Sequence, residues 1–364
     1  MRQSVTLSLY LGRHYLVATL SVFVVLALLA YTFDTVELLR RASGRVEATL
    51  DLVLEMSLLK LPELTTHLFP FAALFGGMLA LSRLTRSQEL TVTRAAGVSV
   101  WQFLFPGLAI SFLLGAFVVT VYNPVSAAML ARFESIEAKV LRGRSSMLAV
   151  SSGGLWLREA DSHGQIVVHA LRVARQGIQL HDAIFFYYEG SDRFIKRIDA
   201  ASATLESGQW ELRNAAISYP DKPAEWHETL KVPTTLTFDR IQESFASPST
   251  ISFWQLPDFI HTLETAGFSA ARHRMHYYSL LTVPVLLCAM LLIAASFSLR
   301  LTRRGGIGLT LAGGVAAGFL FFFSVEVMEP FGLNGTLPVS LAAVAPTAVF
   351  VMLGVSLLFH LEDG

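Results

Sequence analysis

YYSLLTVPVLLCAMLLIAASFSL, residues 277–299, contains no charged side chain. A helix needs roughly 20 mainly apolar residues to cross the hydrocarbon core of a bilayer, and this stretch meets that requirement. Five other stretches share its apolar character: Tyr15–Phe33, Leu61–Ser82, Ser99–Tyr122, Ile307–Val325 and Thr336–Phe359. Six runs of this length favour six transmembrane helices over buried helices of a soluble protein.

Composition supports a membrane protein. Apolar residues make up 53% of the chain and charged residues 15%, and the mean hydropathy is +0.53. The formal net charge is +0, and no basic stripe with interleaved aromatic residues indicates nucleic-acid binding. The single cysteine, Cys288, lies inside the fourth apolar run, so the cysteines do not indicate a redox compartment.

A polar block separates the first three apolar runs from the last three. Six segments in it are rich in β-forming residues, several alternate between apolar and polar positions, and turn residues separate them. These predicted strands are Gly153–Glu159, Gln165–Ala174, Gly177–Glu189, Phe194–Glu206, Gln209–Tyr219 and Trp226–Phe238. Their short, regular spacing predicts an antiparallel sandwich or jelly roll. Alternation is expected to place apolar side chains such as Phe186 and Trp210 on its inner face.

The predicted fold class is therefore an α-helical membrane protein with an antiparallel β jelly roll inserted between the third and fourth of six transmembrane helices. The predicted domains are an N-terminal membrane half at 1–144, the β domain at 145–247 and a C-terminal membrane half at 248–364. The last begins with a connecting amphipathic helix, since Ser252-Phe-Trp-Gln255 matches a capping box and Gly267 stops the pattern.

Basic residues in the short connections predict the orientation, because cytoplasmic loops carry an excess of Lys and Arg. With a cytoplasmic N-terminus, that side holds eight arginines: Arg2, Arg13, Arg83, Arg86, Arg94, Arg300, Arg303 and Arg304. The opposite short loops hold Arg40, Arg41 and Arg45. We therefore expect both termini in the cytoplasm and the β domain on the other side.

A discrete short helix is predicted between the second and third spans, on the cytoplasmic side. Ser87 is its expected N-cap, and the charge of Glu89 suits the positive end of a helix. Gly97 is expected to end it in a left-handed conformation. Ser99 and Gln102 then form a capping-box pattern that opens the third span. A mere connector needs only about 2–8 residues, so these signals favour a docking element at 87–97.

Two further patterns are candidates for binding. Gly314-Val-Ala-Ala-Gly318 is a GxxxG motif, which permits close approach of helices in lipid, although such motifs are frequent by chance. Arg40, Arg41, Arg45 and Arg132 follow the first and third spans. They are either headgroup anchors or a basic rim that grips an anionic amphiphile, since the arginine fork suits phosphate.

No pattern for catalysis or metal binding occurs in the chain. There is no G-x-x-x-x-G-K-[ST], no G-x-S-x-G and no C-x-x-C, and His227-Glu-Thr-Leu-Lys231 lacks the second histidine of a zincin. The sequence therefore predicts a membrane scaffold or transporter subunit without catalytic residues or a metal site, rather than an enzyme.

Together these features resemble the lipopolysaccharide-export permeases LptF and LptG, across essentially the whole chain. In that family the cytoplasmic helix reads S-E-L-x-V-x-x-A-x-G, with Gln88 here in place of its serine. The matching residues are Glu89, Leu90, Val92, Ala95 and Gly97. Tyr122-Asn-Pro124 also resembles the family. The stretch from Phe253 to Phe268 is more similar to LptG than to LptF.

The resemblance implies a permease subunit of an ABC transporter in the bacterial inner membrane, which extracts lipopolysaccharide and passes it to a periplasmic bridge. The implied partners are two copies of the ATPase LptB, one LptF, LptC and the bridge protein LptA. ATP with Mg²⁺ would be bound by the ATPase, so no cofactor is expected in this chain. The implied ATPase-coupling residues are Glu89, Leu90, Val92, Arg94 and Gly97.

The resemblance also implies lipid-binding positions after the first and third spans, which Arg40, Arg41 and Arg132 occupy here. One position that is basic in some members is Asp34 in this chain. The alternatives are an LptF-type subunit, a permease for another lipid or a lipoprotein, a membrane enzyme, and a structural anchor for the β domain. Four spans per chain are common in lipoprotein permeases, and an anchor needs no cytoplasmic docking helix.

Overall fold

The computed structural model describes most of the chain, and the described residues divide into two units. They are residues 5–43, 49–95, 97–140, 148–151, 154–161, 164–174, 179–189, 193–206, 208–220, 222–234, 246–265, 269–301 and 307–362. The helical unit comprises Met1–Leu141, Ser249–Trp254 and Ala271–Gly364. The β unit comprises Arg142–Pro248 and Gln255–Ala270.

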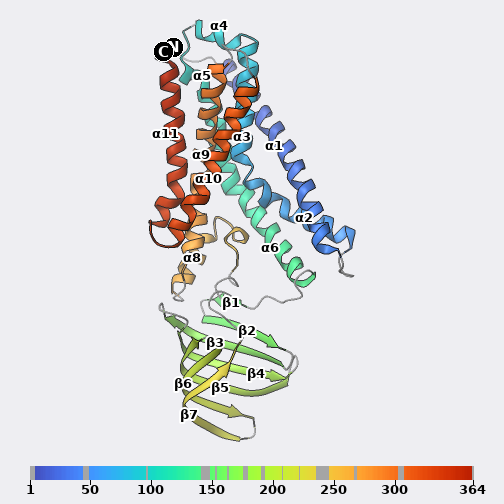
Figure 1. Ribbon diagram of the computed structural model, residues 1–364, viewed down its shortest axis with the longest axis vertical. Coiled ribbons are helices and arrows are strands. Elements are labelled where there is room, and N and C mark those ends of the chain that lie inside the picture. The colour runs from blue at the N-terminus through green and yellow to red at the C-terminus, as the bar shows by residue number, and fades with distance from the viewer. Residues whose placement is uncertain are drawn as a thin grey trace. The chain divides into compact units, whose positions relative to one another are not determined.

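The helical unit consists of long apolar helices and one short helix, α4 (Figure 1). Its elements are α1 (Val5–Ala42), α2 (Leu50–Thr66), α3 (Phe69–Arg86), α4 (Glu89–Ala95), α5 (Val100–Phe117), the π-helical turn η1 (Val118–Tyr122), α6 (Asn123–Val140), α9 (Ala271–Leu301), α10 (Ile307–Leu333) and α11 (Val339–Glu362). Within the described residues, five helices are long and apolar enough to cross a membrane, or six if the bent pair α2–α3 is one span. The predicted helical membrane class is confirmed.

Two spans have a break in their regular α-helical structure: a bend between α2 and α3, and the π-helical turn η1 between α5 and α6. A proline lies next to each break. Helices α2 and α3 meet at an angle of 64°, and Pro70 in the first turn of α3 suits a helix start because its missing N–H is not needed there. Helix α5 continues through the turn η1 into α6, where Pro124 lacks the N–H of a regular α-helix. The hydroxyl groups of Thr65 and Tyr122 form a hydrogen bond that joins the two breaks.

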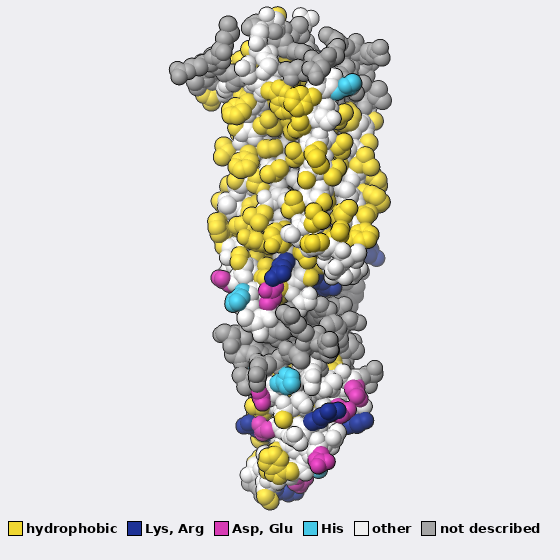
Figure 2. All heavy atoms as spheres, turned by 90° about the vertical axis from the view of Figure 1, so that its left-hand side faces the viewer, with side chains coloured by type: hydrophobic (Ala, Val, Ile, Leu, Met, Phe, Trp, Pro, Cys, Tyr) yellow, Lys and Arg dark blue, Asp and Glu magenta, His cyan; other side chains and the backbone are white. Residues whose placement is uncertain are grey.

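Helix α9 is central to the helical unit. Of its apolar stretch 61% is buried, against 11% for α1 and 17% for α10. Helix α9 packs against α3, α5, α10 and α11. The helices with little buried surface leave a broad belt of apolar side chains, which covers the helical unit in Figure 2. Such a belt is expected where the solvent is lipid rather than water.

Two glycines let helices cross at backbone contact. A Cβ atom added to Gly76 of α3 would lie 2.4 Å from Cα of Thr19 in α1. One added to Gly115 of α5 would lie 2.4 Å from Cα of Pro284 in α9. Real Cβ atoms do not approach backbone so closely, so both crossings require a residue without a side chain.

The β unit is an antiparallel sheet in which each strand pairs with its neighbours in the chain, in the order β1 to β7. The strands are β1 (Leu148–Ser151), β2 (Gly154–Asp161), β3 (Gly164–Ala174), β4 (Gln179–Glu189), β5 (Arg193–Glu206), β6 (Gln209–Tyr219) and β7 (Lys222–Pro233). The unit also contains helix α8 (Leu256–Thr265), which buries Leu256, Ile260 and Leu263 on one face. The predicted antiparallel β domain between the third and fourth spans is confirmed.

The sheet curls around one apolar core. Trp210 and Phe185 are among its largest fully buried side chains, and their rings meet at 70° with centroids 5.9 Å apart. The hydroxyl of Thr234, just after β7, donates a hydrogen bond of 2.6 Å to the buried carboxylate of Glu159 in β2. This contact joins strands at opposite ends of the strand order. Burial, assisted by the charge of Glu159, raises the pKa of Tyr187 to about 12, so this phenol stays protonated.

Several predicted boundaries in this region are wrong. Strand β1 was not predicted, and β7 begins at Lys222 instead of Trp226, because Pro223 lies within the strand and not in the turn before it. Phe185, not Phe186, lies on the inner face with Trp210. Helix α8 begins at Leu256 instead of after Ser252. Residues 235–238 of the last predicted strand lie outside the described residues.

Candidate functional site

Helix α4 is the short helix predicted from the sequence between the second and third spans, and it begins later than expected. Ser87 is not its N-cap, because its hydroxyl donates to the carbonyl of Leu84 and so ends α3. Gln88 takes a positive φ of 60° that separates the two helices. At the other end Gly97 has φ 85°, and the N–H of Val98 donates to the carbonyl of Thr93 at 3.3 Å, as predicted for a left-handed stop.

The next helix starts with the predicted capping box. The backbone N–H of Gln102 donates to Oγ of Ser99 at 3.2 Å, and the N–H of Ser99 donates to Oε1 of Gln102 at 3.3 Å. Both ends of the α4 segment are therefore fixed by local hydrogen bonds. A short helix held in this way keeps a defined orientation, although its own length is too small for stability in isolation.

The side chains of α4 differ in what they contact. Leu90 is buried in a core shared with α1, α3, α5 and α9. Tyr10 of α1 donates a hydrogen bond to the carboxylate of Glu89. Val92 is 68% exposed. The structure therefore makes Leu90 an anchor and leaves Val92 as an exposed apolar side chain of α4. The side chain of Arg94 lies outside the described part of the structure.

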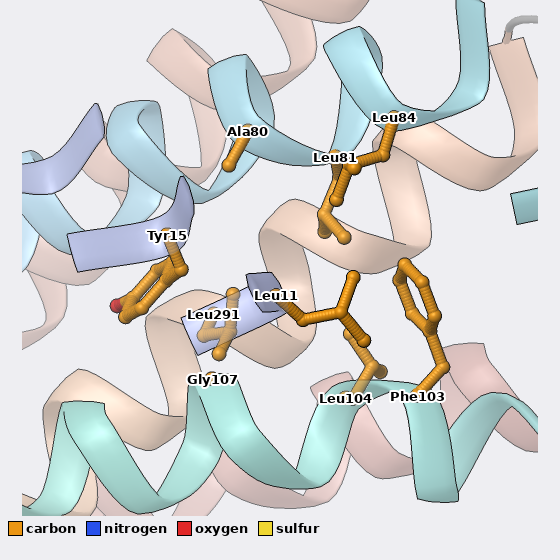
Figure 3. A pocket seen from close by; sticks show the side chains of 9 residues that line it. All are labelled: Leu11, Tyr15, Ala80, Leu81, Leu84, Phe103, Leu104, Gly107 and Leu291. Carbon is orange, nitrogen blue, oxygen red and sulfur yellow. The ribbon is translucent and has the colours of Figure 1, made fainter. Parts of the chain in front are cut away.

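A small cavity lies among the helices of the helical unit (Figure 3). It measures ≈ 20 Å³, and α1, α3, α5 and α9 line it, among them through Tyr15, Leu84, Phe103 and Leu291. A volume of this size holds about one water molecule, and its walls are almost entirely apolar. The cavity is therefore a packing gap between these helices and too small for a lipid chain.

The basic rim, Arg40, Arg41 and Arg132, lies on α1 and α6. These two helices and α2 share a separate apolar core, made of Leu38, Ala42, Val53, Met56, Leu130 and Phe133. The rim side chains are 75%, 52% and 67% exposed, in the order given. The structure thus places all three on one packed group of helices. Arg45 lies outside the described residues.

Each arginine of the rim has an acidic partner. Glu37 accepts two bonds of 2.8 Å from Arg40 and one of 2.8 Å from Arg41. Arg132 donates to Glu55 of α2 at 2.9 Å. These pairs are exposed, so their strength is modest. The three rim arginines are therefore paired with carboxylates and do not form a patch of excess positive charge.

A partly buried ion pair next to the rim was not predicted from the sequence. Lys60 of α2 donates a hydrogen bond to Asp34 of α1, which is 8% exposed, and its ammonium lies 5.6 Å from the ring centre of Phe133. The carboxylate of Asp34 is thus paired with a lysine from the neighbouring helix. The sign of this pair in the sequence is that Lys60 is the only basic residue in α2.

The GxxxG motif packs inside the chain. A Cβ atom added to Gly314 would lie 2.5 Å from Sδ of Met78, and one on Gly318 would lie 2.9 Å from Cε1 of Phe71. Both neighbours belong to α3. Within the described residues no group of three His, Cys, Asp or Glu side chains is placed to hold a metal ion.

The fold and these surfaces define a class: multi-pass helical membrane proteins with an inserted antiparallel β unit and a short helix between the second and third spans. The family model described as "Lipopolysaccharide export system permease LptF/LptG" matches residues 9–360. The chain therefore belongs to the LptF/LptG family of lipopolysaccharide export permeases, as predicted.

The chain is similar to proteins named "Lipopolysaccharide export system permease protein LptG". The protein of Escherichia coli (strain K12) is 25% identical over 318 residues, which cover 84% of each chain. The protein of Haemophilus influenzae is 24% identical over 357 residues, which cover 96% of each chain. The similarity to LptG thus includes both helical halves and the β unit.

Proposed function

We propose that this chain is the LptG-type permease subunit of an ABC transporter that extracts lipopolysaccharide from the bacterial inner membrane and passes it to a periplasmic bridge. The family match over residues 9–360 carries this proposal, and the LptG names of the relatives support the subunit assignment. The chain acts without catalysis and without a cofactor of its own. ATP with Mg²⁺ is bound and hydrolysed by a separate ATPase.

The proposed assembly contains two LptB ATPases, one LptF, LptC and the bridge protein LptA. Both termini and α4 lie in the cytoplasm, and the β unit lies in the periplasm. In Figure 1 the two chain ends are at the same end of the helical unit as α4, which supports one cytoplasmic face. Helix α4 docks on LptB through Val92, and the basic rim receives the lipid phosphates.

Copurification tests the assembly directly. The tagged chain is expressed with LptF and an untagged LptB, and bound lipid is identified by mass spectrometry. We expect stoichiometric ATPase and lipopolysaccharide. Recovery of a lipoprotein in place of lipopolysaccharide would contradict the proposed cargo, and folded protein that never retains LptB would contradict the proposed transporter.

Substitutions in the rim are expected to raise or to lower the amount of bound lipid, depending on the charge that they change. Glu37→Gln removes the carboxylate that occupies both Arg40 and Arg41, so lipid occupancy should rise. Arg40→Glu with Arg41→Glu should lower it severalfold. Replacement of both by Lys should retain part of it, because the charge remains while the bidentate fork is lost. The measurement is lipopolysaccharide per complex at fixed salt, since exposed charges are screened.

Arg213→Glu is the matched control for the rim variants, because Arg213 in β6 is also exposed and paired with a nearby glutamate, Glu211. It should leave lipid occupancy unchanged. Equal occupancy in the wild type, the Gln variant and the double Glu variant would reject phosphate binding and leave the rim arginines as interfacial anchors.

A further inference from the structure

Residues Ser249–Trp254 form a strap that groups with the helical unit, although the chain on either side of it, Arg142–Pro248 and Gln255–Ala270, groups with the β unit. The chain therefore leaves the β unit, contacts the helical unit through six residues and returns before α9 begins. A plain connector would pass from the β unit to α9 once, so this path of the chain indicates a specific role for the strap.

The strap binds at the break in the third span. Pro124 has no N–H, so the carbonyl of Thr120, four residues earlier, lacks the donor that an α-helix would supply. The indole N–H of Trp254 donates to this carbonyl at 3.2 Å. One residue before Pro124, the buried side chain of Asn123 accepts a hydrogen bond of 2.7 Å from the backbone N–H of Phe253.

The strap also contacts two other helices of the unit. The ring of Phe253 stacks on Tyr277 of α9, with centroids 5.4 Å apart and an interplanar angle of 13°. Ser249 donates a hydrogen bond to the carboxylate of Glu63 in α2. The strap therefore connects α2, which precedes the first break, and α6, which follows the second, to the central helix α9.

The parts that the strap connects have separate cores. Beyond their breaks, α2 and α6 pack with the end of α1 in the core around Met56 and Phe133. Helices α9, α10 and α11 pack with α3 in a different core. In Figure 1, α2 and α6 diverge from α9, α10 and α11 toward the end of the helical unit away from the chain termini. Two packed groups joined at two helix breaks have the construction of a hinge.

We propose that the strap is a latch: by binding the break in the third span it fixes the α2–α6 group, which carries Arg132 and packs against the end of α1, relative to α9. Trp254 and Asn123 are its positioning residues. The latch itself does not depend on the cargo. Its consequence for lipid capture rests on the proposed function, because the basic rim belongs to the group that it holds.

Hydrogen exchange tests the docking of the strap. The backbone N–H of Phe253 is protected while it donates to Asn123, so its exchange rate reports the undocked fraction. Trp254→Phe keeps the ring and removes the indole N–H. We expect exchange at Phe253 to rise about fivefold, which corresponds to one hydrogen bond of about 1 kcal/mol. Trp226→Phe, at an exposed position in β7, is the control and should leave this rate unchanged.

A double-mutant cycle tests the role of the proline. Pro124→Ala supplies the missing donor to Thr120, so the indole becomes redundant. In the Pro124→Ala background, Trp254→Phe should raise exchange at Phe253 less than twofold. Unchanged exchange in Trp254→Phe alone, or an equal rise in both backgrounds, would overturn the latch.

A distance measurement tests the hinge. In a Cys288→Ala background, spin labels at Ser135→Cys in α6 and Thr336→Cys between α10 and α11 report the separation of the two groups; both positions are exposed. Trp254→Phe should broaden the distance distribution in the assembled complex without added lipid. An unchanged distribution beside raised exchange at Phe253 would reject the hinge. Raised exchange and a broadened distribution with unchanged lipid occupancy would support the latch and count against the proposed lipid capture alone.

Discussion

Val92→Asp is expected to separate the permease from its ATPase. Val92 is the exposed apolar side chain of α4, and an uncompensated carboxylate in an apolar contact costs several kcal/mol. We expect LptB to bind at least about 30-fold more weakly, as for loss of an interface hot spot of about 2 kcal/mol. Titration of the solubilised permease with labelled LptB measures this change.

Val92→Ile is the matched control, because it keeps an apolar contact of similar shape and should bind LptB normally. Glu89→Lys tests the neighbouring position. Since Glu89 accepts a hydrogen bond from Tyr10, this change should lower the melting temperature as well as the affinity for LptB. Normal LptB affinity in Val92→Asp would show that the ATPase docks elsewhere on the permease.

Gly76→Ala should destabilise the helical unit. The new Cβ would overlap the backbone of Thr19 at the point where α1 crosses α3, and backbone cannot move aside as a flexible side chain can. Overpacking of this kind typically costs 1–3 kcal/mol. Because little of α1 is buried, the lost contact is a large part of what holds it. We expect a lower thermal midpoint and faster proteolysis of α1.

Gly308→Ala is the control for Gly76→Ala. Gly308 is also helical, in α10, but a Cβ added there meets no atom within 4 Å. This change should be neutral or stabilise the chain by about 0.5–1 kcal/mol, the helix propensity difference between the two residues. Equal effects of the two changes would mean that the α1–α3 crossing does not depend on close backbone contact.

Local patterns in the sequence predicted local structure well. The apolar runs located the membrane helices, alternation located β2 to β6 to within a few residues, and the Ser99–Gln102 capping box and the Gly97 stop are both present. These features depend on neighbouring residues, whose hydrogen bonds and burial follow from a short stretch of chain. Errors occurred where two local interpretations competed, as at Ser87, which ends one helix and does not begin the next.

Pairings between distant residues could not be predicted. Nothing near Asp34 indicates Lys60 as its partner, and nothing near Arg132 indicates Glu55, because both pairs depend on how α1, α2 and α6 pack. The Ser252–Gln255 stretch matched a capping box, whereas its aromatic residues bind the third span. A tertiary contact overrode a local signal there.

The strand order of the β unit also bears on how it folds. Since every strand pairs with its neighbour in the chain, each hairpin can form as soon as its second strand is available, and no strand waits for a distant one. The exception is the hydrogen bond between Glu159 and Thr234, which are 75 residues apart. We therefore expect the sheet to grow hairpin by hairpin from its N-terminal strands during synthesis, with this closing contact formed last.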